Sequence, residues 1–420
     1  MMKKFSIGAL LVAMAVVMAG PAQAAFTVGG ENGWSLSTDG IVNIFGTYQA
    51  TEAAPTGAVT ASFLNNGPDA NQKFGVRVGL LPSIIAFNVK APTTAGIDSN
   101  VRAAMYVNVQ NSGGLDASGG LVNPLATHYN TDPNIDFREF FYTASGKFGS
   151  FLAGRALNLF QGQNILNDMT LFTAGVVDSS VVHGGTSLGH IAYGYLYANF
   201  GPQFRYTTPD MGGVKVAMEI GEPYMISRDS AKTNIPRFET EVSYATTFKG
   251  GSIHAWLGGL WQQDTRLNSG PRPGGHNTSL GIAPGVNAAI GPVGLMLSGY
   301  YGRGLGVFST QDGDAVFNAS TDAFGIERKH WGFLAQTTFQ VTDSVRLAAN
   351  YGRTDVSATD QEGPATGVKK TQEAAVAQMN FNLNKFTQFT LEYIWARDSW
   401  FNVHDKMTSH QVALGTVFFW

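Results

Sequence analysis

The residues of this sequence that could most clearly do chemistry are charged side chains in segments where apolar and polar residues alternate. Arginines that fall on the polar face of alternating segments are Arg77, Arg102, Arg155, Arg205 and Arg346. Candidate opposing acids are Asp168 and Asp178 in a long connection, with Glu219, Glu239, Glu241 and Glu392 in alternating segments. Arginines on one wall of a watery passage and carboxylates on the opposite wall would create a transverse field that orients dipolar solutes. For each arginine, the alternatives are a rim residue that binds lipopolysaccharide phosphates and an ion pair with no role in transport.

Catalytic and metal-binding patterns are weak by comparison. His183, Ser187 and Asp178 lie close in sequence, but no G-x-S-x-G turn accompanies them. Asp312-Gly313-Asp314 offers oxygen ligands of the kind that Ca²⁺ prefers, but a solvated loop is the favoured interpretation. We therefore expect no catalysed reaction, no bound metal and no cofactor.

The elements that would position the charges are β-strands with one apolar and one polar face. Val101, Met105 and Val109 alternate with Arg102 and Tyr106 in one such segment. Similar segments predict about sixteen strands, at 34–50, 72–90, 99–110, 135–146, 149–158, 201–209, 212–222, 236–249, 251–264, 276–290, 292–304, 321–341, 344–356, 368–384, 386–399 and 406–420. Short Gly-, Asn- and Asp-containing turns alternate with long polar connections between them. The pattern predicts an all-β, antiparallel transmembrane barrel.

The N-terminus predicts export from the cytoplasm. Lys3 and Lys4 precede a short apolar stretch that ends at an A-x-A site, Ala22-Gln23-Ala24. This is the pattern of a signal peptide, and the apolar stretch is too short for a membrane helix. We expect residues 1–24 to be removed and residues 25–420 to form one barrel domain.

Composition agrees with a barrel. The chain has 51 Gly and no Cys, and 14% of its residues are charged. Loss of Lys3 and Lys4 leaves 25 basic against 30 acidic residues, which argues against a nucleic-acid partner. Seven tryptophans near strand ends suit the aromatic girdles of a membrane barrel.

The last strand carries a further signal. Apolar or semi-polar residues occupy every second position from Val412 to Trp420, including Phe418. This ending resembles the C-terminal signature of bacterial outer-membrane barrels, in which a terminal Phe or Trp is recognised by the barrel-assembly machinery. The resemblance implies that Trp420 closes the last strand against the first strand of the barrel.

Two internal stretches resemble the general porins of Gram-negative bacteria. The stretch from Arg138 to Arg155 is similar to their R-x-x-[YF], Gly turn and G-R pattern, and 203–213 is similar to x-R-Y-x-[ST]-P-x-x-G-G. The resemblance implies a homotrimer in the outer membrane, in contact with lipid and lipopolysaccharide. It also implies a third long loop, here 156–190, that folds into the barrel, and it places Arg138 in the lumen. This loop departs from the acidic P-E-[FW]-G-G-D type of that family.

These patterns predict a passive diffusion channel for small hydrophilic solutes and ions. A substrate-selective channel for sugars, organic acids or anions is the first alternative. A barrel enzyme or adhesin is the second.

Overall fold

The chain folds almost entirely as antiparallel β-strands, as its alternating sequence predicts. The computed structural model describes residues 26–58, 62–64, 72–109, 135–177, 186–227, 230–268, 272–309, 320–362 and 367–420. Its elements in chain order are β1 (Phe26–Gly29), β2 (Ser35–Thr51), β3 (Gln72–Arg77), β4 (Ser83–Lys90), β5 (Asp98–Val107), β6 (Ile135–Gly146), β7 (Gly149–Leu157), α1 (Gly162–Leu166), β8 (Phe200–Thr207), β9 (Val214–Gly221), β10 (Ser230–Lys232), β11 (Arg237–Phe248), β12 (Gly251–Arg266), β13 (His276–Ile290), β14 (Val293–Arg303), η4 (Gly306–Phe308), β15 (Lys329–Gln340), β16 (Val345–Val356), β17 (Lys369–Asn382), β18 (Thr387–Trp400) and β19 (Met407–Phe419).

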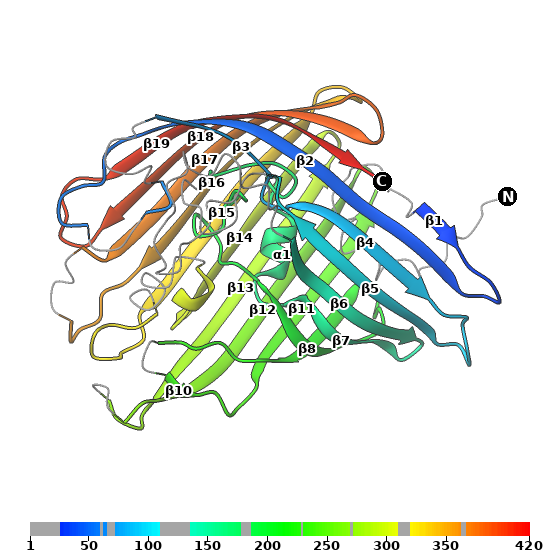
Figure 1. Cartoon of the computed structure of the whole chain (residues 1–420), viewed down its shortest axis with the longest axis horizontal. Helices are drawn as coiled ribbons and strands as arrows, with labels where there is room; N and C mark the ends of the chain where they lie inside the picture. Colours follow the sequence, from blue (N-terminus) through cyan, green and yellow to red (C-terminus); the bar gives the residue numbers. More distant parts are fainter. Residues whose placement is uncertain are drawn as a thin grey trace.

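The strands pair with their sequence neighbours and then close into a barrel (Figure 1). β19 lies antiparallel to β2, with Phe419 opposite Ile41 and Ser409 opposite Thr51. β2 pairs with β4 along its first half and with β3 along its second half, so β3 and β4 together form one strand of the wall. Counted in this way the barrel has sixteen strands, which confirms the predicted number.

Two predicted strands need correction, and two short strands were missed. The predicted strand 72–90 is interrupted between β3 and β4, where the side chain of Asn43 bonds the backbone of Gly79 and Leu81. The predicted strand 321–341 begins only at Lys329. The side chain of Asp322 accepts the N–H groups of Phe324 and Ile326 and so holds the residues before Lys329 in a turn. The short strands β1 and β10 were not predicted.

The two faces of the sheet differ as the alternation predicts. Large apolar side chains on the outer face, such as Ile282, Leu347 and Leu414, are exposed. Inner positions of the same walls carry buried polar side chains, such as Asn350 and Gln378. An apolar outer band around a polar interior is the arrangement of an outer-membrane barrel.

The connections divide the barrel into two different ends. Short turns lie at one end, for example 147–148, 249–250 and 291–292, and both described chain ends lie there too. Longer connections, among them 158–199 and 304–328, lie at the other end of the strands. Short turns face the periplasm in barrels of this class and long loops face outward, so we call these the periplasmic and external ends.

The terminal tryptophan completes the last strand pairing. The backbone N–H groups of Gly40 and Trp420 donate to each other's carbonyl oxygens, both at 3.1 Å. A Cβ atom on Gly40 would lie 2.4 Å from the indole of Trp420, so only glycine leaves room for the ring there. The expected closure of the last strand against the first wall strand is confirmed.

Candidate functional site

Segment 158–199 contacts the inner face of most of the barrel wall. Its described residues, 158–177 and 186–199, are almost all buried. Side chains from six wall strands bond to it: Glu239 (β11), Trp256 (β12), Asn350 (β16), Glu392 (β18), Gln411 (β19) and Gln49 (β2). Tyr195, Leu196 and Phe160 of the segment also pack against wall residues in apolar clusters. The segment is therefore fixed to the inner face by both polar and apolar contacts.

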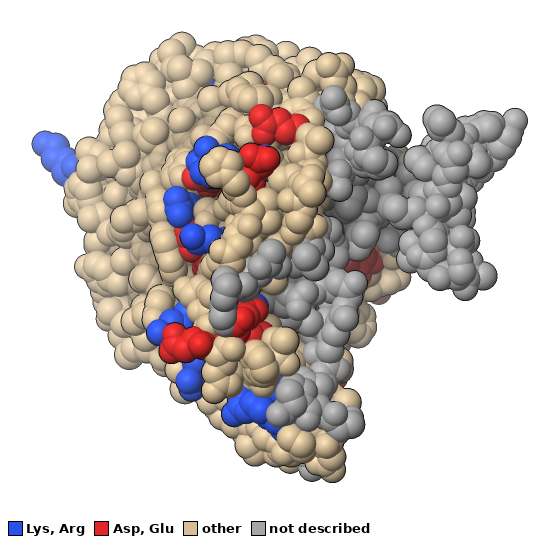
Figure 2. All heavy atoms as spheres, turned by 90° about the vertical axis from the view of Figure 1, so that its left-hand side faces the viewer, with Lys and Arg blue, Asp and Glu red and all other residues tan. Residues whose placement is uncertain are grey.

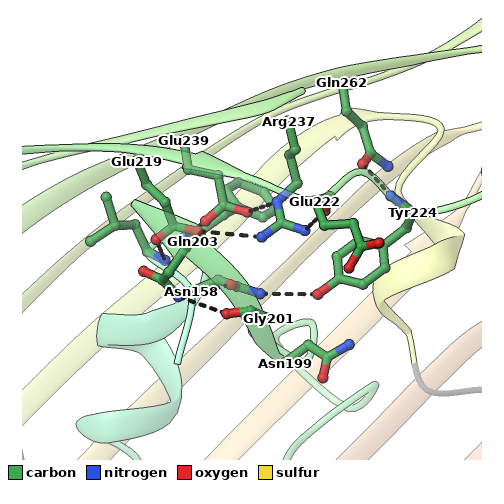
Figure 3. A network of polar contacts seen from close by, with 12 residues as sticks. Asn158, Asn199, Gly201, Gln203, Glu219, Glu222, Tyr224, Arg237, Glu239 and Gln262 are labelled. Carbon is green, nitrogen blue, oxygen red and sulfur yellow. Dashed lines mark hydrogen bonds and ion pairs between the residues drawn. The ribbon is translucent and has the colours of Figure 1, made fainter. Parts of the chain in front are cut away.

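The start of this segment is held by four buried charged residues (Figure 3). Glu219 on β9 and Glu239 on β11 lie directly opposite each other in the sheet. Arg237 donates a hydrogen bond to Glu219 at 3.3 Å and forms an ion pair with Glu239 at 2.7 Å. Arg205 on β8 lies 2.9 Å from Glu219. Two cations thus compensate two anions where water is excluded, which buried charges require.

The carboxylates of this cluster accept backbone N–H groups of the segment. The N–H of Phe160 donates to Glu239 at 2.7 Å, and the N–H of Leu159 donates to Glu219 at 3.2 Å. Arg205 donates to the carbonyl of Leu157. We call Arg205, Glu219, Arg237 and Glu239 the anchor cluster, because Arg205, Glu219 and Glu239 bond to the chain where the segment leaves β7 and Arg237 pairs with both carboxylates.

Asn158, which lies beside the anchor cluster in Figure 3, connects the two ends of the segment. Asn158, at its start, donates to the carbonyl of Ala198, near its end, at 2.9 Å. The same amide donates to the hydroxyl of Tyr224 at 3.1 Å. The guanidinium of Arg237 lies 4.6 Å from the centre of the Tyr224 ring, a cation–π distance. Burial raises the pKa of Tyr224, so the phenol stays protonated.

Glu392 and Asp168 hold other parts of the segment. Glu392 accepts the N–H groups of Ala174 and Gly175, at 3.0 and 3.1 Å, and the hydroxyl of Thr173 at 2.7 Å. Asp168 accepts the hydroxyl of Tyr195 at 2.7 Å, within the segment itself. Burial raises the pKa of Tyr195 well above its usual range, and the charge of Asp168 raises it further.

A second group of charges lies on the wall formed by β5, β6 and the start of β2. Arg102 donates to Asp39 at 2.8 Å and to Glu139 at 2.9 Å. The side chain of Arg102 is 19% exposed, and those of Asp39 and Glu139 are 25% and 16% exposed. These ion pairs are reached by water, unlike those of the anchor cluster.

Arg138 lies nearer the external end of the same wall. Ala104 and Met105 of β5 pair with Glu139 and Phe137 of β6, so Arg138 is the extra residue at a shift in the strand register. Its guanidinium bonds Asp136 at 2.8 Å and lies 5.1 Å from the centre of the Tyr106 ring. Burial raises the pKa of Tyr197 in the segment, the charge of Arg138 opposes this rise, and the charge of Asp136 adds to it. We call Arg102, Arg138, Asp39, Asp136 and Glu139 the β5–β6 wall.

Two of the predicted arginines, Arg102 and Arg205, do not lie on a wall opposite the carboxylates. Arg102 and Arg205 both pair with acids on neighbouring strands. Figure 2, which views the left-hand side of Figure 1, likewise has basic and acidic side chains close together in one band. Strand parity predicts which face a side chain occupies, but the partner across the sheet depends on strand register.

The remaining predicted residues occupy varied positions. Arg77 is buried on β3, Arg155 is exposed on β7, and Arg346 is partly exposed on β16. Glu241 accepts the side-chain amide of Gln163 at 3.1 Å. Asp178, His183, Asp312 and Asp314 lie outside the described residues.

Sequence reasoning missed several residues of the site. Arg237 stands two positions before Glu239 on a predicted strand, so parity alone would have placed it on the same face. Asp39, Asp136 and Glu139 become recognisable only once register brings them to Arg102 and Arg138. Asn158 carries no local signal, because its partners lie 40 and 66 residues away.

Comparison with known proteins agrees with this geometry. The chain aligns with three outer-membrane channels of known structure, each at 13% identity. The DcaP channel of Acinetobacter baumannii matches with a TM-score of 0.64, covering 95% of this chain and 100% of that one. The anion-selective porin of Comamonas acidovorans matches at 0.61, covering 92% and 100%, and Salmonella typhi OmpF, in a complex with daunomycin, at 0.54, covering 92% and 98%. These likenesses establish the fold.

A family match establishes membership. No curated protein matches the sequence significantly. The family model described as Gram-negative porin matches residues 9–399, nearly the whole chain. Family and fold together place this multi-pass barrel in the outer membrane as a diffusion channel. The chain belongs to the Gram-negative porin family.

Proposed function

We propose that this porin passes small hydrophilic solutes and ions through a narrow passage between segment 158–199 and the β5–β6 wall. In this proposal the segment is the inward-folded third long loop. The observation that carries the proposal is the contrast in exposure between the two sides of the interior. Asn350, Gln378 and Glu392 are buried, whereas Asp136 on the β5–β6 wall is 51% exposed.

The lining residues follow from this position. Arg102, Arg138 and Arg155 would border the passage, together with Asp39, Asp136 and Glu139. Asp168, Arg205, Glu219 and Glu392 would hold the segment in place, and Arg77 is buried beside it. Because Arg102 and Arg138 have acids beside them, we expect this part of the passage to be hydrated, with much of its charge compensated.

Cysteine accessibility tests the route, since the chain has no native cysteine. We expect a charged thiol reagent to lower the single-channel conductance of an Arg155→Cys variant. A Thr390→Cys variant is the matched control, because Thr390 is 1% exposed on the inner face. If the reagent blocks the Thr390→Cys control and has no effect on the Arg155→Cys variant, the passage lies on the other side of the interior.

We also propose that the channel is a passive pore and not an enzyme, and that it assembles as a homotrimer. One structural neighbour, OmpT of Vibrio cholerae, is described in a trimer form. Migration of unheated protein on a denaturing gel at three times the monomer mass would support the trimer. Migration as a monomer, with full conductance, would contradict it.

Lipopolysaccharide is the proposed lipid partner. Arg303 on β14 and Lys329 on β15 lie directly opposite each other, and both are exposed on the outer face near the external end. Like charges in such a pair repel each other unless an anion lies between them. We expect Arg303→Gln with Lys329→Gln to reduce co-purifying lipopolysaccharide, and an unchanged amount would refute this contact.

The chain ends are proposed to act during biogenesis. Residues 1–24 would direct export, and Phe418 and Trp420 would be recognised by the barrel-assembly machinery. Phe418 and Trp420 stack with ring centres 6.4 Å apart. We expect Trp420→Ala to lower the assembled fraction in cells while refolding in detergent is retained. Equal loss in both settings would indicate a purely structural role.

A further inference from the structure

Arg346 is a lumen-facing arginine that has no partner among the described residues. It shares the inner face of β16 with Ala348 and Asn350, which are buried. Its own side chain is only partly exposed, yet its guanidinium makes neither an ion pair nor a hydrogen bond within the described part of the chain. A guanidinium withdrawn from water without acceptors is unfavourable, so this group is suited to an anion from solution.

The neighbours of Arg346 are uncharged amides, and the amide oxygens of Asn380 and Asn382 already accept hydrogen bonds. Gln340 and Asn380 lie directly opposite Arg346 on the two adjacent strands. The amide oxygen of Asn380 accepts the hydroxyl of Thr390 at 2.7 Å. On the next inner positions, Gln388 donates to Asn382 at 2.9 Å. The wall around Arg346 is therefore polar and uncharged, with no carboxylate at either cross-strand position.

A second cation lies at the same end of the lumen. Lys215 on β9 shares the inner face with Ala217 and Glu219 and lies opposite Ser243. Lys215 is partly exposed and has no ion pair among the described residues. The acids Asp39 and Glu139 are engaged by Arg102, and Glu241 by Gln163. Lys215 and Arg346 are therefore two lumen-facing cations near the periplasmic end that have no ion-pair partner among the described residues.

We infer that Arg346 binds the oxyanion group of small anionic solutes at the periplasmic end of the lumen, and that Lys215 helps to concentrate them there. The planar guanidinium suits a carboxylate or a phosphate, since it donates to two oxygens at once. The channel then prefers anions, although the β5–β6 wall carries three carboxylates and two arginines. This inference rests on the proposed diffusion channel and adds its solute class.

Planar-bilayer recording with two blocking anions tests the site. Inorganic phosphate and succinate are titrated separately against a constant KCl background. We expect Arg346→Gln to raise the half-blocking concentration of both anions roughly 5- to 10-fold. Arg346→Lys should recover part of the block, because lysine keeps the positive charge but lacks the planar guanidinium that donates to two oxygens at once. A rise for phosphate alone, or for succinate alone, would support the site and name its ligand.

The control and the contradicting results are distinct. Lys249→Gln removes an exposed cation from a periplasmic turn and should leave the block unchanged. If the wild-type protein conducts and Arg346→Gln keeps the wild-type half-blocking concentrations, the inference fails while the channel function stands. If the wild-type protein does not conduct in KCl, the proposed function fails and the inference fails with it.

Discussion

The anchor cluster and the β5–β6 wall use the same residue types on the same inner face, but for different purposes. In the anchor cluster the Arg237 and Glu219 side chains are fully buried, and the carboxylates accept backbone N–H groups of segment 158–199. On the β5–β6 wall, Arg102 and its acids are partly exposed and bond only to side chains. The difference teaches that burial and a backbone partner decide whether an inner charge holds structure or meets solute.

The largest effect is expected from Arg237→Ala. Its loss leaves Glu219 and Glu239 facing each other with only Arg205 as a nearby cation, and a broken buried pair costs about 3–5 kcal/mol. We expect a lower urea midpoint for the refolded protein. Glu222→Gln, an exposed neighbour, is the control. Wild-type stability in Arg237→Ala would mean that the cluster does not anchor the segment.

A smaller effect is expected from Glu392→Ala. The substitution leaves the N–H groups of Ala174 and Gly175 without their acceptor, at about 1–3 kcal/mol for each buried donor. The middle of the segment should loosen, so single-channel current noise should increase. Glu373→Gln, on the outer face, should leave the noise unchanged. If the wild-type protein and both variants show equal current noise, Glu392 has no influence on the passage.

The smallest effect on stability, with a clear effect on selectivity, is expected from Arg102→Gln. Because this ion pair is partly exposed, its loss should cost less than ~1 kcal/mol. The unpaired charges of Asp39 and Glu139 should shift the reversal potential in a salt gradient toward cations, and Arg155→Gln should shift it in the same direction. An unchanged reversal potential in both variants would remove these arginines from the narrow part of the passage.

Local sequence patterns predicted the fold better than the site. Alternation at 101–109 and the terminal aromatics predicted faces, strand number and closure, because each depends on period and turn chemistry. The site depends on register and on a long connection. Asp39 meets Arg102 across 63 residues, and Glu392 meets Thr173 across 219 residues. No local pattern encodes such pairs.

Single-channel recording of the purified wild-type protein in a planar bilayer tests the central claim most directly. The account predicts ohmic conductance in KCl, with three equal conductance steps for a trimer. It also predicts that the reversal potential in a salt gradient indicates a preference for anions. Absence of any ohmic conductance from correctly folded protein would contradict it.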